Sequence, residues 1–278
     1  MGGVRHNENF RLNCDGWEVC RKQRPLLLQD FLSRGDYRPA LRLAPVTGAV
    51  ENVGFPDEQQ FYYSMIFSSS KAGLALSIGD GTPDIKLQSG IAAVSWLQKD
   101  KADTRAAVFI KPYSNTRILE RSEWADSVAE CIGIDIDSYN IATMRNLVQL
   151  EKKNAAQLRE IKKRLQVPFA IKGVFTEEDL DLVREVKPDI AVVSNHGGRI
   201  ETRTGSTAEF LMQYGEELRS VCGQVWVDGG IRSPLDVATA MALGAKQVMI
   251  GRPVITALCK GGTDAVVALA QELKSRPA

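Results

Sequence analysis

Eight short apolar runs, each followed by a segment with helical character, constrain the fold of this chain more than any other feature. Strands that alternate with helices pair in parallel through right-handed crossovers. Eight such units in about 240 residues predict a (β/α)8 TIM barrel. A doubly wound sheet is the alternative, but no G-x-G-x-x-G motif follows the first run. The expected strands are Leu41–Thr47, Leu74–Ile78, Ala106–Lys111, Ile132–Asp137, Phe169–Lys172, Ile190–Ser194, Val225–Asp228 and Val248–Ile250.

Helix signals and the N-terminal region complete this prediction. Leu, Glu, Lys and Gln at helical spacing predict a helix over Thr143–Leu165. Thr176 and the Ser233-Pro234 pair are typical of helix starts, and Gly244 is typical of a helix end. Residues 1–40 are predicted to be an N-terminal extension across one end of the barrel, irregular except for one helical turn or more over Pro25–Phe31. Residues 41–278 are predicted to form the barrel itself, as a single domain.

Composition narrows the class of protein. The formal net charge of +1 favours neither a nucleic-acid partner nor a membrane surface, and we find no apolar run near the roughly 20 residues that span a bilayer. Five scattered cysteines without a CxxC pair, together with two histidines, predict no metal site. The odd cysteine count suggests reduced thiols and a cytoplasmic location, and the polar first ten residues lack the apolar segment of a signal peptide.

The polar residues that carry chemistry follow the predicted strands. In a TIM barrel, active sites lie at the carboxyl ends of the strands. The sixth strand ends in Ser194-Asn195-His196-Gly197-Gly198-Arg199, where His196 is a candidate base and Arg199 suits a carboxylate. The seventh and eighth strands end in Asp228-Gly229-Gly230-Ile231-Arg232 and Gly251-Arg252-Pro253. Two adjacent basic, glycine-containing ends predict a phosphate site, although both could instead be simple turns.

These motifs, together with Ile171-Lys172-Gly173-Val174, Ala242-Leu243-Gly244-Ala245-Lys246 and Ala44-Pro45-Val46, resemble a known signature. It is that of the FMN-dependent α-hydroxy acid oxidases and dehydrogenases, which include glycolate oxidase, lactate oxidase and mandelate dehydrogenase. The resemblance is specific over residues 168–256, loose over 41–140 and fades in the first 40. It identifies the chain as a shortened, divergent member of that family.

The resemblance implies a role for each matching position. His196 matches the base, Asp137 the carboxylate that orients this base, and Arg199 the residue that grips the substrate carboxylate. Lys172 matches the lysine beside flavin N1 and O2. The FMN phosphate site and the isoalloxazine contacts are implied at Asp228, Gly229, Gly230, Arg232, Gly251 and Arg252, and at Val46, Thr47, Ser77 and Asp135. From the residues alone, Asp137 could instead cap a turn, and Asp135 is equally available to His196.

Several positions depart from the family pattern. Ala107 and Phe109 stand where the family has a Gln and a Tyr on strand three, and Asp135 stands where it has a Thr. Tyr37 is a weak match for the N-terminal substrate tyrosine, and Arg145 is an approximate match for a second substrate arginine. The family's long loop after strand four is nearly absent. These departures leave FMN binding better supported than hydroxy acid oxidation.

Three functions fit this reading. The first is an FMN-dependent oxidoreductase that oxidises a small 2-hydroxy acid, with oxygen, a quinone or a protein as electron acceptor. The second is an FMN enzyme with another substrate, such as an isomerase or a reductase. The third is a non-catalytic barrel that binds flavin or phosphate. Family membership also implies a homo-oligomer.

Overall fold

Eight parallel strands form a barrel in the computed structural model, which describes residues 7–35, 37–140, 148–200 and 202–277. The strands pair in the order β1-β8-β7-β6-β5-β4-β3-β2. A bridge between Arg42 and Ala75 joins the two outer strands and closes the barrel, so a doubly wound sheet is excluded. The strands are β1 Leu41–Leu43, β2 Leu76–Gly79, β3 Ala106–Ile110, β4 Ala129–Asp135, β5 Phe169–Val174, β6 Ile190–Val193, β7 Gln224–Asp228 and β8 Gln247–Ile250.

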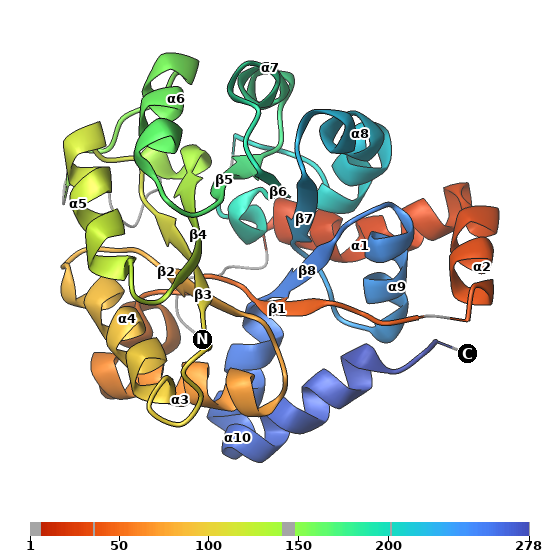
Figure 1. The fold of residues 1–278 in the computed structure, drawn as a ribbon. Helices are drawn as coiled ribbons and strands as arrows, with labels where there is room; N and C mark the ends of the chain where they lie inside the picture. The colour runs from red at the N-terminus through yellow and green to blue at the C-terminus, as the bar shows by residue number, and fades with distance from the viewer. Residues whose placement is uncertain (1–6, 36, 141–147, 201, 278) are drawn as a thin grey trace.

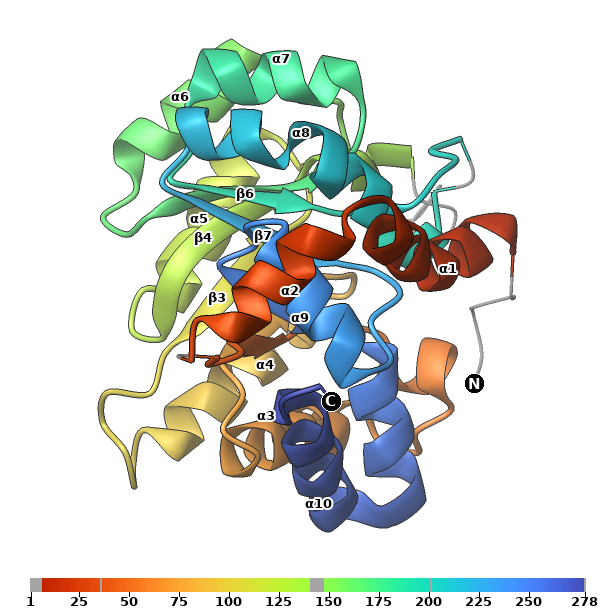
Figure 2. The ribbon, with the colours of Figure 1, turned by 90° about the vertical axis from the view of Figure 1, so that its right-hand side faces the viewer.

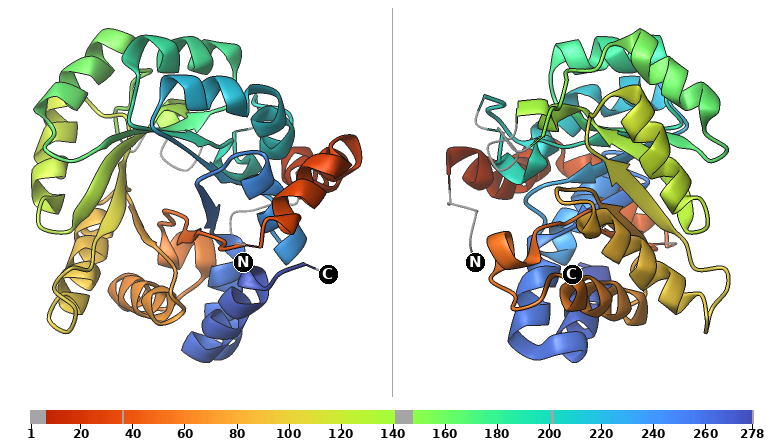
Figure 3. Two further views of the ribbon diagram at one scale, coloured as in Figure 1. Left: turned by 45° about the vertical axis from the view of Figure 1, so that its right-hand side comes forward. Right: turned by 90° about the vertical axis from the view of Figure 1, so that its left-hand side faces the viewer.

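Helices surround the strands on all sides, as Figures 1 and 3 show. Short turns of 3-10 helix, η2 (Ile136–Asn140) and η3 (His196–Gly198), follow β4 and β6, and a short π-helix, η1 (Ala49–Val53), follows β1. The α-helices are α1 Glu8–Gln23, α2 Pro25–Ser33, α3 Glu58–Lys71, α4 Ile85–Leu97, α5 Asn115–Ala125, α6 Ala155–Arg164, α7 Glu177–Val186, α8 Thr207–Val221, α9 Pro234–Ala242 and α10 Arg252–Lys274.

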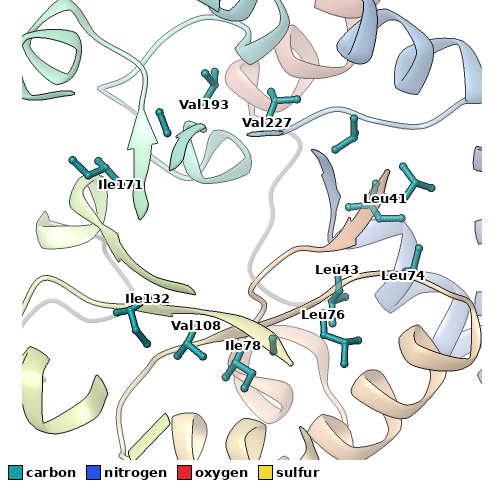
Figure 4. Packing of buried hydrophobic residues seen from close by; sticks show 14 of the residues in the cluster. Leu41, Leu43, Leu74, Leu76, Ile78, Val108, Ile132, Ile171, Val193 and Val227 are labelled. Carbon is teal, nitrogen blue, oxygen red and sulfur yellow. The ribbon is translucent and has the colours of Figure 1, made fainter. Parts of the chain in front are cut away.

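Two apolar layers hold the barrel together, because side chains alternate between the two faces of each strand. The larger layer lies between strands and helices, and Figure 4 shows members such as Val108, Ile132 and Ile171 on the outer side of their strands. The smaller layer fills the barrel interior, where Phe109 packs against Gly133 and Ala170. Its members are Ala107, Phe109, Cys131, Ala170, Ile190, Val192, Trp226 and Met249. The interior is therefore a packed core that supports the carboxyl ends of the strands.

The helix starts predicted from Thr176 and Ser233 are confirmed, but the prediction of one long helix over Thr143–Leu165 is wrong. Thr176 and Ser233 each cap a helix and take part in a capping box, α7 with Asp179 and α9 with Asp236. Helix α6 begins only at Ala155, because Asn154 forms a capping box there with Gln157. Residues 148–154 are not helical, and residues 143–147 lie outside the described residues.

The N-terminal extension is more regular than predicted, since α1 was not expected, whereas the helical turn predicted over Pro25–Phe31 is confirmed by α2. Helix α1 packs across α8, α9 and η3, which Figure 2 shows from the side. The Trp17 indole donates a hydrogen bond to the Gly229 carbonyl over 2.9 Å. Gly230 has a φ of +77°, and a Cβ there would lie 1.8 Å from the Asn13 carbonyl oxygen. The close approach of α1 therefore requires a glycine at this position.

By its length and composition, helix α10 could cross a membrane, and it is the only helix among the described residues of which this is true. It has non-helical backbone at Gly261 and Gly262. In the structure α10 packs against α3 and α9 as an outer helix of the barrel. Its apolar residues therefore have a place in this fold.

We expect Asn13→Ala to lower the free energy of unfolding by at least about 2 kcal/mol, because each buried group left unpaired costs about 1–3 kcal/mol. Asn13 is buried on α1, donates to Asn195 Oδ1 over 2.7 Å and accepts from the Thr207 amide over 3.0 Å. Urea denaturation measures this loss. Glu18→Ala, on the exposed face of the same helix, should change stability by less than about 0.5 kcal/mol. Equal stability of the two variants would contradict the anchoring role of Asn13.

Candidate active site

A cavity opens at the carboxyl ends of the strands, where the barrel fold predicts chemistry. Residues from six strand ends contribute to its wall, and the side that follows β1 is mainly apolar. The lining residues are Ala44, Pro45, Val46, Thr47, Lys111, Lys172, His196, Gly197, Arg199, Asp228, Gly229, Gly230, Ile231, Arg232, Met249, Ile250, Gly251, Arg252, Pro253 and Ile255.

His196 and Asp137 form a hydrogen-bonded pair at one side of the cavity. Nδ1 of His196 lies 3.2 Å from Oδ1 and 3.3 Å from Oδ2 of Asp137. The Asp137 side chain has no exposed surface, whereas that of His196 is 16% exposed. His196 has a φ of +57°, which is rare outside glycine and often occurs at functional sites. Its amide donates to Ser194 Oγ, which holds the turn in place.

The charges around this pair decide its protonation. Burial lowers the pKa of His196, Asp137 opposes that effect, and Lys111 and Lys172 lower the pKa further. Burial alone would raise the pKa of Asp137, but His196 and Lys172 hold it below its usual value. Asp137 is therefore a carboxylate that accepts the Nδ1 proton, and Nε2 of a neutral His196 has a free lone pair.

Two buried lysines share Asp135 beside this pair. Nζ of Lys111 lies 2.8 Å from Asp135 Oδ2, and Nζ of Lys172 lies 3.1 Å from Oδ1. Lys172 is also 3.7 Å from Asp228. Burial opposes both shifts, yet the lysines lower the pKa of Asp135, and Asp135 and Asp228 raise the pKa of Lys172. Lys172 is therefore a fixed ammonium in the wall of the cavity.

Metal-ligand atoms of Asp135, Asp137 and His196 lie within 4.8 Å of one another. The two ammonium groups of Lys111 and Lys172 already contact Asp135 from both sides. Because they neutralise its charge, the group is an ion-pair network around a histidine.

Three arginines give the cavity a strong preference for anions. Burial, together with the neighbouring charges of Arg199 and Arg232, lowers the pKa of Arg252 to about 10. Arg252 donates to the Gly197 carbonyl, and the ring of Phe10 lies 4.5 Å from its guanidinium and 5.4 Å from that of Arg232. Within the described part of the chain, the Arg199 side chain has no hydrogen bond or ion pair, and burial lowers its pKa.

The cavity fits the flavin mononucleotide that the resemblance implies. Arg232 and Arg252 lie at the ends of β7 and β8, where glycines leave backbone N–H groups accessible. The apolar wall of Ala44, Pro45 and Val46 suits a planar ring. The Lys172 ammonium suits the negative charge that develops near N1 of a reduced flavin. Asp228 Oδ1 is buried and has no hydrogen-bond partner among the described residues, which makes it a further polar atom for this ligand.

The structure brings most of the predicted site residues together. Asp137 and Asp135 lie just behind the cavity, in contact with His196 and with the two lysines. The predicted residues that line it directly are Val46, Thr47, Lys172, His196, Arg199, Asp228, Gly229, Gly230, Arg232, Gly251 and Arg252.

Two predicted residues are misplaced, and a third cannot be placed. Ser77 is fully buried beside Ala107 in the β2–β3 pair and does not line the cavity. Tyr37 precedes β1 at the opposite end of the barrel and packs edge-on against Phe31. Arg145 lies outside the described residues. Proximity along the sequence to a strand end was therefore not enough for Ser77.

Lys111 is the functional residue that the sequence comparison missed. The prediction assigned the altered strand-three positions to Ala107 and Phe109, but both are buried in the barrel interior below the cavity. Lys111, two residues after Phe109, lines the cavity instead. The two-residue period of a strand would have identified it, since alternate residues share a face.

Comparisons with known proteins agree with this site. Residues 94–276 match the family described as FMN-dependent dehydrogenase. The chain is 37% identical over 118 residues to a 2-hydroxyacid oxidase of Dictyostelium discoideum, which covers 42% of the chain and 30% of that protein. It is 41% identical over 102 residues to a 4-hydroxymandelate oxidase of Amycolatopsis orientalis, covering 36% of the chain and 28% of that protein. The chain thus matches about three tenths of the length of these relatives.

A solved structure supports the fold over nearly the whole chain. Mandelate oxidase with benzoyl-formic acid superposes with a TM-score of 0.66 and 21% sequence identity. The superposition covers 95% of this chain and 92% of that one.

Proposed function

The chain belongs to the FMN-dependent dehydrogenase family, and we propose that it oxidises a small 2-hydroxy acid with His196 as the base. The observation that carries this proposal is the His196–Asp137 pair, which faces the same cavity as the buried Lys172 ammonium and as Arg199, whose side chain has no partner among the described residues. Together these groups match the three needs of such a reaction, which are a proton acceptor, a carboxylate receptor and a cation for the reduced cofactor.

Each residue has a defined task in this reaction. Bound FMN supplies the two-electron acceptor. Arg199 binds the substrate carboxylate, and because no described residue pairs with its guanidinium, that group is available to a ligand. Nε2 of His196 takes a proton, and the Asp137 carboxylate stabilises the imidazolium that results. Lys172 adds positive charge where reduction places negative charge.

Anaerobic mixing tests this proposal. The FMN-loaded protein should lose its oxidised flavin absorbance on mixing with a 2-hydroxy acid from a panel that varies the side chain. Methyl esters of the same acids are the matched control, because they cannot pair with Arg199. A flavin that every 2-hydroxy acid leaves oxidised would contradict the proposal.

Arg252→Ala should weaken FMN binding by about 1.5–3 kcal/mol, the range for a hydrogen bond to a charged group. The reason is that Arg252 lies at the end of β8, where we place the phosphate. Fluorescence titration of the apoprotein with FMN measures the loss, and riboflavin, which lacks the phosphate, should be insensitive to the substitution. Arg203→Ala is the control, because Arg203 is paired with Asp179 outside the cavity lining. Unchanged FMN affinity in Arg252→Ala would remove the phosphate assignment.

The electron acceptor, the oligomeric state and the cellular location of the protein are separate proposals. Oxygen, a quinone and a protein are the acceptor candidates, and reoxidation rates of the reduced flavin with each of them decide among these. A homo-oligomer follows from family membership, and sedimentation tests it. The five free cysteines support a reducing, cytoplasmic location. An isomerase, a reductase or a non-catalytic barrel has less support, because the relatives described above are named as oxidases.

A further inference from the structure

Lys111 presents a positive charge to the reacting side of His196. Its Nζ lies 3.5 Å from Nε2 of His196 and 2.8 Å from Asp135 Oδ2. The side chain of Lys111 is only 7% exposed, and both Lys111 and His196 line the cavity. A buried ammonium therefore lies next to the lone pair of the proposed base, in the wall of the cavity where a substrate would bind.

The tautomer of His196 gives this contact its meaning. Asp137 accepts the Nδ1 proton from the opposite side of the ring, so Nε2 of the neutral imidazole is an acceptor. Lys111 has only protons to donate. If Nε2 took a proton in the free protein, two cations would face each other across 3.5 Å in a buried site. Lys111 thus favours an unprotonated Nε2 before the substrate arrives.

We propose that Lys111 is a second cationic residue at the reacting face of His196, where it keeps Nε2 free of a proton and binds the hydroxyl oxygen of the substrate. This inference rests on the proposed function for the identity of that oxygen. The distance allows the arrangement, because an oxygen can lie about 2.8 Å from each of two nitrogens that are 3.5 Å apart. The hydroxyl would then donate to Nε2 while its oxygen accepts from Lys111.

The proton transfer balances in this arrangement. The substrate O–H bond breaks and an N–H bond forms at Nε2, while the Lys111 ammonium compensates the negative charge left on oxygen. The Cα–H bond would then break as the C=O bond forms, and its hydrogen would leave with both bonding electrons, as a hydride equivalent, to FMN, the oxidant of the proposed function. A fixed cation next to an oxygen that gains negative charge stabilises the transition state more than the ground state.

Other charged groups around His196 set the background for this effect. Asp137, at the start of η2, faces Nδ1 and favours the imidazolium. Lys172 on β5 disfavours it, as Lys111 does. The imidazolium lowers the pKa of Asp135 on β4 and opposes the rise that burial causes in the pKa of Asp228 on β7. Lys111 is distinct from all of these, because among the described residues its side chain is the one that contacts Nε2.

NMR titration of the two histidines in the FMN-loaded protein tests the effect of charge without any turnover. The sequence has only His6 and His196, so a His6→Gln variant assigns the signals. In Lys111→Gln, which retains a donor for Asp135, the pKa of His196 should rise by about 1 or more, because a unit charge within 4 Å is lost. In Lys111→Arg it should stay close to the parent value. An unchanged His196 titration in Lys111→Gln overturns the proposal.

A matched lysine elsewhere provides the control. Lys153 is also buried and paired, with Glu151 and with Asn115 Oδ1 at 2.9 Å, but it lies outside the cavity lining. Lys153→Gln should leave the His196 titration unchanged. If Lys111→Gln does not fold, the single variant Asp135→Asn is compared with the double variant Asp135→Asn/Lys111→Gln. The pKa of His196 should be higher in the double variant.

Flavin reduction tests the contact with the substrate. Lys111→Gln should slow reduction by a 2-hydroxy acid at least about tenfold, since an amide donates a weaker bond than an ammonium to an oxyanion. The acid limb of the rate profile should move to higher pH together with the NMR titration. A parent protein that is reduced normally, with Lys111→Gln equally fast, overturns the oxygen contact while the proposed function stands. If no 2-hydroxy acid reduces the flavin of the parent protein, the proposed function and this oxygen contact are both overturned. The NMR titration then still decides whether Lys111 lowers the pKa of His196.

Discussion

His196→Asn is expected to slow flavin reduction by a 2-hydroxy acid about 10²–10⁴-fold, the usual loss when a general base is removed. The asparagine side chain branches at Cγ as histidine does and is of similar size there. Asparagine also tolerates the left-handed backbone of this position, where φ is +57°. It offers no basic nitrogen to the cavity. Rapid mixing under anaerobic conditions measures the reduction step by itself. FMN content should change little, because the phosphate site is at the ends of β7 and β8.

The pH dependence of the parent supplies a second check on His196. The base must be neutral, so the rate should fall as the pH drops through the pKa of His196. Burial, together with Lys111 and Lys172, lowers this pKa below its ordinary value of 6.5. The acid limb should therefore lie below pH 6.5 and should be absent from any residual activity of His196→Asn. Reduction at the parent rate in this variant would exclude His196 as the base.

The strand pattern and the strand ends were sufficient to predict the barrel and most of its site. Alternation of apolar runs with helical segments fixes a parallel, closed sheet, and such a sheet brings residues at all carboxyl ends to one face. His196, Lys172 and Arg252 could therefore be placed together although 80 positions separate the outer two. At β3 the two-residue period that links Ala107 and Phe109 continues to Lys111, which lines the cavity and was not predicted.

The remaining errors have local physical causes. Asn154 stops the helical pattern of residues 143–165, because its capping box with Gln157 sets the start of α6. Helix α1 was not predicted, although Asn7 caps its start. Its position depends on the burial of Trp17 and Cys20 and on hydrogen bonds of Asn13 and Trp17 to distant loops. Such contacts depend on the folded barrel, and no local sequence signal reports them. Ser77 was predicted to contact the flavin, but it lies within β2 and the cavity begins further along that strand.

Asp137→Asn is expected to slow flavin reduction about 10²–10⁴-fold although it changes the shape of the site very little. An aspartate that orients a catalytic histidine contributes up to about 10⁴ in rate, because its loss permits the wrong tautomer. Here an asparagine amide could donate to Nδ1, which would place the ring proton on Nε2 and remove the acceptor. The substitution also removes the charge that stabilises the imidazolium, so the pKa of His196 should fall further, since Asp137 raises it.

Asp135→Asn is the matched comparison for this prediction. The two acids are two residues apart, and both are almost completely buried, with 3% and 2% exposure. Asp135 contacts Lys111 and Lys172, whereas Asp137 contacts Nδ1 of His196. Asp135→Asn should therefore slow reduction less than Asp137→Asn, and only Asp137→Asn should disturb the imidazole tautomer in nitrogen NMR spectra. If flavin reduction is much slower in Asp135→Asn and nearly normal in Asp137→Asn, then the charge on the lysine network, and not the orientation of His196, limits the reaction.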